Sequence, residues 1–241
     1  KKNNLKVKWI HLFYPSKTIR FLRDANKITK ILNSKSKDTS HLILDNLFSF
    51  KSATKALIKY FKIVTIYLIH RKSLIIKKSS SLSEFNNILG PYISDSFMGH
   101  KLLRNIFFYE CFNNLVNAID KPKMGIYIME NIDFELILNY LWKKKINSEL
   151  ISFPHSSARF WDLRYFFLNQ NNSKKLFPNK VLIHSKDTLD WAENIKISSK
   201  DIIPVESLRY EDLILKKNFI KKKIFKNFLV FTDLDETINK A

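Results

Sequence analysis

A histidine follows a short apolar segment at a position where a proton acceptor would be useful. His155 comes after residues 149–153 (ELISF) and Pro154, and Ser156 comes directly after it. Proline ends a strand because it lacks the N–H that the strand ladder needs. Histidine exchanges a proton near neutral pH, as removal of the proton from an attacking hydroxyl requires. We predict that His155 is catalytic or positions a substrate, with a purely structural histidine as the alternative.

A second polar segment follows the apolar residues 125–129 (GIYIM). Glu130 ends this segment without any helix-forming reason to be there, whereas Asn131 is suited to cap the helix that follows. Asp133 and Glu135 fall in the first turn of that helix, where the helix dipole stabilises acids. The pattern predicts a functional Glu130, a capping Asn131 and structural roles for the other two acids.

These residues need elements that bring them together, and the second half of the chain alternates strands with helices. The predicted strands are 125–129, 149–153, 180–183 and 201–205, and the predicted helices are 132–144 and 186–193. Such alternation is typical of βαβ units with a parallel sheet, whose ligands bind at the carboxyl ends of the strands. We expect an α/β fold with a Rossmann-like parallel sheet flanked by helices, and Glu130 and His155 at its ligand edge.

The first half of the chain predicts two further strands and two long helices. The strands are expected at 7–13 and 41–48, and the helices at 52–69 and 95–119. The polar residues 79–83 (SSSLS), together with Gly90-Pro91, predict a linker. Ser94 or Asp95 is expected to cap the second helix, whose apolar face places Cys111 in the core.

The formal charge of +20 is the most unusual property of the composition, with 42 Lys and Arg against 22 Asp and Glu. It fits solvated surface lysines, an anionic membrane surface or nucleic acid. The basic residues are spread along the chain without a zinc finger, RNP strand or helix-turn-helix pattern, which disfavours nucleic acid. Residues 52–69 form a basic amphipathic helix that can lie on an anionic bilayer, but a core-facing helix with solvated lysines is the preferred interpretation.

Several classes of enzyme are disfavoured because their motifs are missing. The three glycines form no G-x-G-x-x-G, Walker A or G-x-S-x-G segment. The single cysteine, Cys111, has no disulfide partner in the chain and forms no cysteine-based metal site.

We expect a cytoplasmic protein, peripheral on the inner membrane at most, with no metal and no resident cofactor. Residues 56–69 are too few, and too charged, to cross a bilayer.

Several segments resemble a family of surface-carbohydrate biosynthesis proteins. They are Asp95-Ser96-x-x-Gly99, Glu130-Asn131 with Glu135, Phe153-Pro154-His155-Ser156, residues 178–183 and residues 202–210 (IIPVESLRY). The resemblance covers about residues 92–213 and departs from the family pattern at Ile132, Asp133, Phe134 and Pro154. Members of this family look like two-domain glycosyltransferases of the GT-B type.

The resemblance implies that residues 1–215 are the acceptor-side half of a bacterial glycosyltransferase, cut off within a linker and first strand at 216–241. Such an enzyme transfers a sugar from a nucleotide-activated donor, held mainly by the missing domain, to a glycan or lipid-linked acceptor of surface polysaccharide biosynthesis. The fragment alone is then expected to be inactive. In related polymerases that transfer phosphoglycerol units, the histidine that matches His155 is a candidate base.

The site expected from position and resemblance has three parts. The catalytic residues are His155 and Glu130, the substrate-binding residues are Asn131, Ser156 and Arg209, and the cleft residues are Asp95 and Gly99. Arg209 is included because a fixed guanidinium can clamp a phosphate or a carboxylate.

The end of the chain carries a competing motif. Residues 228–237 (FLVFTDLDET) resemble the strand and D-x-D-x-T segment of haloacid-dehalogenase-type phosphatases. That resemblance implies Asp233 as nucleophile and Asp235 as general acid, with magnesium bound between them. The alternatives are the first strand of a second GT-B domain and, from a different class, a non-catalytic basic module that docks on a membrane or a partner enzyme.

Overall fold

The computed structural model describes residues 6–74, 86–130, 132–146, 148–154, 176–183 and 201–205. The chain divides into two compact units, Lys1–Pro204 and Val205–Ala241, and the elements below belong to the first. The domain boundary expected near residue 215 and the helix expected at 186–193 lie outside the described residues, so both stay predictions.

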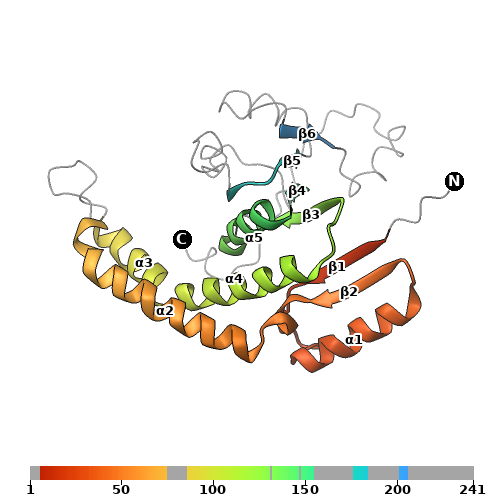
Figure 1. Ribbon diagram of the computed structural model, residues 1–241, viewed down its shortest axis with the longest axis horizontal. Helices are drawn as coiled ribbons and strands as arrows, with labels where there is room; N and C mark the ends of the chain where they lie inside the picture. The colour runs from red at the N-terminus through yellow and green to blue at the C-terminus, as the bar shows by residue number, and fades with distance from the viewer. Residues whose placement is uncertain are drawn as a thin grey trace, which may run out of the picture. The chain divides into compact units, whose positions relative to one another are not determined.

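The described part is an α/β structure of parallel strands flanked by helices (Figure 1). Its strands are β1 (Val7–His11), β2 (Thr39–Ile43), β3 (Met124–Met129), β4 (Glu149–Pro154), β5 (Lys180–Ile183) and β6 (Ile202–Pro204). Its helices are α1 (Leu22–Lys35), α2 (Phe50–His70), α3 (Asn86–Met98), α4 (His100–Ala118) and α5 (Asp133–Lys145), with the 3-10 turns η1 (Leu44–Leu47) and η2 (Arg71–Leu74). The expected fold class is therefore confirmed.

The strands form two parallel sheets. β1 pairs with β2, while β3, β4, β5 and β6 lie side by side in chain order, the Rossmann-like arrangement expected for the second half of the chain. Between these two sheets, the helices α2, α3 and α4 separate β2 from β3 along the chain. The strand expected at 41–48 ends at Ile43, where η1 begins.

A glycine lets α5 pack closely on the larger sheet. A Cβ on Gly125 would lie 2.6 Å from a ring carbon of Trp142 and 2.9 Å from Leu150 Cδ1. Along β3 the residues then alternate, with Met129 buried and with Ile126 and Ile128 exposed, as the two faces of a strand require.

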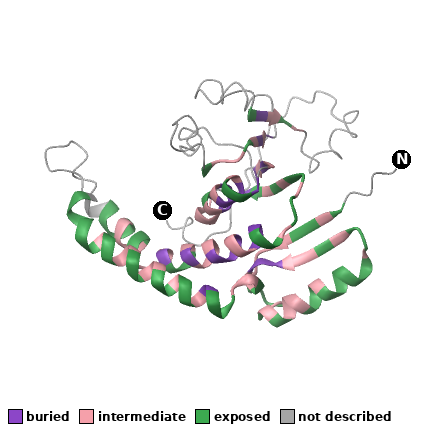
Figure 2. Ribbon diagram, viewed as in Figure 1, coloured by how far each residue is buried: buried purple, intermediate pink, exposed green. Residues whose placement is uncertain are grey.

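Helix α4 contributes most to the hydrophobic core. It packs against α2, α3, α5 and η1, and Figure 2 shows its buried residues in purple. The buried cluster consists of Leu44, Cys111, Phe112, Leu115, Val116, Leu138, Leu141, Trp142, Ile146 and Leu150. The expectation that Cys111 belongs to the core is confirmed.

The single helix expected at residues 95–119 is wrong, because the chain breaks at Gly99. Asp95 lies inside α3, and Gly99 is the N-cap of α4 without a side-chain hydrogen bond. A Cβ on Gly99 would lie only 2.8 Å from Asp95 Cα. Glycine therefore permits a change of direction that any side chain would obstruct, and neither Ser94 nor Asp95 caps α4.

The linker expected around Gly90-Pro91 is also wrong at these two residues. Both lie within α3, which begins at Asn86. Pro91 is exposed and lies inside the helix, past its first turn, so α3 forms there despite the loss of one internal backbone hydrogen bond. Residues 79–83 lie outside the described part of the chain.

The apolar face expected on α2 turns only partly toward the core. Ala56, Tyr60 and Val64 are partly buried, whereas Leu57 and Phe61 are exposed. The preferred interpretation of α2 as a core-facing helix with solvated lysines thus holds for one side of the expected apolar face and fails at Leu57 and Phe61. Of the helices that the structure describes, none has the combined length and apolarity needed to span a bilayer.

Candidate functional site

The candidate site lies where β3 and β4 end. The two strands pair in register up to Met129 beside Pro154, so their carboxyl ends lie next to each other. Glu130 is exposed at this edge. His155 and Ser156 follow Pro154 in the chain but lie outside the described residues, as does the expected phosphate clamp Arg209.

A buried carboxylate fixes the backbone at this edge. Glu135 is 4% exposed, and its Oε1 accepts a hydrogen bond of 2.7 Å from the backbone N–H of Glu130. The helix begins at Asp133 with Ile132 as the N-cap and no side-chain cap. The expectation that Asn131 caps α5 is therefore wrong. Glu135, the third residue of the helix, instead bonds to a backbone N–H that precedes the helix, as a glutamate at this position often does.

The start of α5 is tied to α4 by charge and by aromatic packing. Arg104 Nη2 lies 3.0 Å from Asp133 Oδ2, with the two side chains 41% and 46% exposed, and the ring centres of Phe108 and Phe134 lie 5.0 Å apart. Asp133 and Glu135 thus make structural contacts, as the sequence indicates. These contacts set the direction in which α5 leaves the strand edge.

Asp95 and Gly99, expected to shape the same cleft, lie at the junction of α3 and α4. The N–H of Gly99 donates to the backbone oxygen of Asp95 over 3.1 Å. Gly99 precedes Arg104 by five residues, about 7.5 Å along a helix axis, and Arg104 in turn reaches Asp133. Asp95 thus lies just before the start of α4, whereas Glu130 lies just before the start of α5.

Polar groups that the sequence pattern did not predict lie between α5 and the larger sheet. Asn139 of α5 is buried, and its Nδ2 donates to Tyr127 Oη over 3.0 Å. Tyr127 pairs across the sheet with Ser152, which is fully buried. Within the described part of the chain, Asn139 Oδ1 has no partner. An asparagine on the apolar face of a predicted helix was the available signal.

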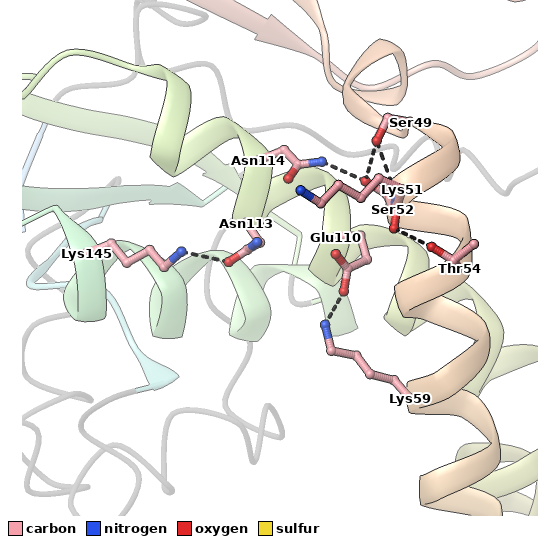
Figure 3. A network of polar contacts seen from close by, with 9 residues as sticks. All are labelled: Ser49, Lys51, Ser52, Thr54, Lys59, Glu110, Asn113, Asn114 and Lys145. Carbon is pink, nitrogen blue, oxygen red and sulfur yellow. Dashed lines mark hydrogen bonds and ion pairs between the residues drawn. The ribbon is translucent and has the colours of Figure 1, made fainter.

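A second buried polar cluster joins α2 to α4 (Figure 3). Glu110 of α4 is 1% exposed and forms an ion pair with Lys59 of α2. Nearby, Asn114 donates to Leu47 O over 2.8 Å and to Ser52 Oγ over 2.9 Å. These contacts connect residues about 50 to 70 positions apart in sequence, and they hold α2 against the core rather than forming an open site.

The shifted pKa values fall outside the strand edge. Burial, followed by the nearby Asp45 and Glu110, raises the pKa of the Cys111 thiol to about 12, so this thiol is a poor nucleophile. Burial and then His41 lower the pKa of His11, whose Nε2 lies 2.9 Å from His41 Nδ1. Burial lowers the pKa of Lys143, and Asp201 opposes that change.

The described residues contain no group of three or more His, Cys, Asp or Glu side chains arranged to hold a metal ion. Asp233 and Asp235, which the resemblance to phosphatases implies as a magnesium-binding pair, lie outside them. The described part of the chain is thus an α/β structure with a Rossmann-like parallel sheet, and an acidic residue, Glu130, is exposed at the carboxyl ends of its strands. Comparison with protein-family models, curated proteins and solved structures found no match to this chain.

Proposed function

We propose that this chain is the acceptor-side domain of a two-domain glycosyltransferase in the biosynthesis of a bacterial surface polysaccharide. The observation that carries the proposal is the pairing of Met129 with Pro154. It makes Glu130 and His155 the successors of two neighbouring parallel strands at the sheet edge where α/β proteins bind ligands. A carboxylate and an imidazole at one edge suit the activation of a sugar hydroxyl.

In the proposed reaction, His155 takes the proton of an acceptor hydroxyl as its oxygen attacks the anomeric carbon of the donor sugar. The bond from that carbon to the nucleotide phosphate breaks, and the phosphate leaves with the bonding electron pair. Glu130 orients the acceptor or the imidazole, while Asn131, Ser156 and Arg209 hold the substrate. The nucleotide sugar binds chiefly to a second domain.

The fixed backbone at Glu130 supports this assignment. Its N–H is held by the buried Glu135, so an exposed carboxylate is presented from a backbone position that does not depend on the ligand. Binding groups on a rigid support lose less entropy when a ligand binds. A glutamate free to vary its backbone would position an acceptor less well.

The test is sugar transfer by the protein that joins this chain to its second domain, with radiolabelled nucleotide sugars as donors and a membrane lipid extract as acceptor. His155→Ala is expected to lower kcat about a hundredfold or more, as loss of a general base does. The matched control is His100→Ala, a change at an exposed histidine at the start of α4.

Two outcomes contradict the proposal. Full transfer activity of His155→Ala would favour a non-catalytic docking module. Magnesium-dependent hydrolysis of a phosphate monoester that is lost in Asp233→Asn, without any sugar transfer, would favour the phosphatase.

A further inference from the structure

Helix α2 carries an exposed apolar stripe, defined as Phe50, Leu57, Phe61 and Leu68. The intervals of seven, four and seven residues return to nearly the same angle around a helix with 3.6 residues per turn. Phe50 is 87% exposed and Phe61 is 63% exposed, and the other two are also exposed. The stripe spans about 27 Å at ~1.5 Å per residue. Figure 2 shows how much of α2 is exposed along its length.

The opposite side of α2 is occupied by the rest of the fold. Tyr60 Oη donates to the backbone oxygen of Met98 over 2.6 Å, and the ring of Tyr67 stacks on Phe97 at 5.3 Å. Lys59 reaches Glu110 of α4. Tyr60, Tyr67 and Lys59 lie about 80 to 180° around the helix from the stripe at ~100° per residue. The stripe therefore points away from α3 and α4 and is held in that orientation.

Exposed lysines lie on one side of the stripe, about a third of the way around the helix. Lys51, Lys55 and Lys62 are exposed and lie about 100 to 140° around the helix from Phe50 at ~100° per residue. Between residues 50 and 70 the sequence contains no Asp or Glu. Lysines beside an apolar surface extend their methylene stems over it and keep the ammonium in a polar layer. This combination fits the boundary between lipid phosphates and acyl chains.

We propose that α2 docks this protein on the surface of an anionic lipid bilayer, lying in the plane of the interface. The stripe enters the upper acyl region, and Lys51, Lys55 and Lys62 contact the lipid phosphates. A second copy of the chain fits less well, because symmetric pairing of this face would bring like charges together. The docking does not depend on the proposed sugar transfer.

The experiment is flotation of the 241-residue chain with phosphatidylcholine vesicles that do or do not contain phosphatidylglycerol. Binding is expected only with the anionic vesicles. The triple change of Lys51, Lys55 and Lys62 to Gln should weaken it about fivefold per lysine, or about a hundredfold in total.

The matched control removes the same charge from another helix. Lys27, Lys30 and Lys35 are exposed on α1, and their triple change to Gln should leave binding within about twofold of the original, because only charges near the bilayer surface contribute strongly. Equal weakening by both triple variants would mean that net charge alone attracts the protein and would overturn the proposal. Absence of binding to anionic vesicles would overturn it as well.

A position-specific readout separates insertion from charge attraction. A dye sensitive to polarity is attached in Phe61→Cys and, as a control, in Ile31→Cys on α1, where Ile31 is likewise exposed. The native Cys111 is fully buried and escapes labelling. Emission at position 61 should shift to the blue on anionic vesicles, while emission at position 31 should not.

The labelling experiment also has clear contrary outcomes. A dye that stays in water at position 61 while the protein is bound to vesicles would overturn the proposal. So would a dimer or a complex with an acidic protein that Phe61→Ser dissociates, since the stripe would then serve a protein partner.

Discussion

Replacement of Lys59 by methionine should destabilise the fold strongly, because it leaves the carboxylate of Glu110 without its cation. The Glu110 side chain is 1% exposed, and Lys59 is its ion-pair partner. Removing one member of a buried pair costs about 3–5 kcal/mol. Water reaches this pair, since the Lys59 side chain is 40% exposed, so we expect a loss of about 2–3 kcal/mol.

Methionine is chosen because it keeps the apolar stem. Lys59 Nζ also lies 4.4 Å from the ring centre of Tyr109, and methionine retains part of that packing while removing the charge. Glu110→Gln should cost only about 1 kcal/mol, because the freed lysine can turn to solvent and the amide still bonds. The double variant should lose about 1.5 kcal/mol, which gives a coupling energy of about 2 kcal/mol.

The assay is urea unfolding followed by far-ultraviolet circular dichroism for the original chain, both single variants and the double variant. The control is Lys55→Met, one helical turn away, where the lysine is exposed. If Lys59→Met proves no more harmful than Lys55→Met, or if the two single losses simply add, the ion pair does not anchor α2 and the reasoning is refuted.

Three further predictions concern the glycines, the cysteine and the histidine pair. Gly125→Ala should lower the free energy of unfolding by about 1–3 kcal/mol, because the added methyl group overpacks against Trp142. Gly90→Ala, with no atom near its Cβ, should instead stabilise α3 by up to about 1 kcal/mol. Urea unfolding of both variants distinguishes them. Cys111 should react with a thiol reagent only after unfolding, and because its pKa is raised to about 12, its contribution to stability should decline as pH rises from about 9. The lowered pKa of His11 favours the neutral ring in the fold, so stability should fall as pH drops below about 6.5, and His11→Phe should reduce that slope in thermal unfolding.

The second half of the fold could be predicted because its signals are local. The apolar segments at β3, β4, β5 and β6 are short and bounded by turn residues, and the helix between β3 and β4 has the length of a crossover. Local pattern and global fold agree there. Helix α5 differs from its predicted range by one residue at each end, and at its start the side chain of Glu135, rather than that of Asn131, accepts a hydrogen bond from the backbone.

The first half was harder because periodicity does not report changes of direction. The apolar spacing continues through Gly99, yet the chain turns there because only glycine fits so close to Asp95. Spacing also says nothing about which strands pair. Whether β1 and β2 join the larger sheet depends on the path of α2, α3 and α4 between them, which no local pattern specifies.

The candidate site shows the same division between local and distant information. Glu130 could be selected because it follows a predicted strand, and strand ends are where α/β proteins place their ligands. The role of Glu135 could not be predicted from the sequence. The helix dipole favours an acidic residue in the first turn whether its side chain is exposed or buried. Only its burial and its bond to the Glu130 N–H distinguish the two cases.

Helix α2 shows why an amphipathic pattern alone could not decide between core and membrane. Its apolar residues cover more of the helix surface than α3 and α4 can bury, and the sequence does not reveal where that contact ends. Lys59 marks the boundary between the buried and the exposed side of α2. From the sequence alone it looks like one more solvated lysine, because its partner, the buried Glu110, lies 51 positions away. By fixing which side of α2 faces the core, this pair also fixes which side is left for lipid. Loss of the pair should therefore weaken vesicle binding even though Lys59 itself lies away from the stripe.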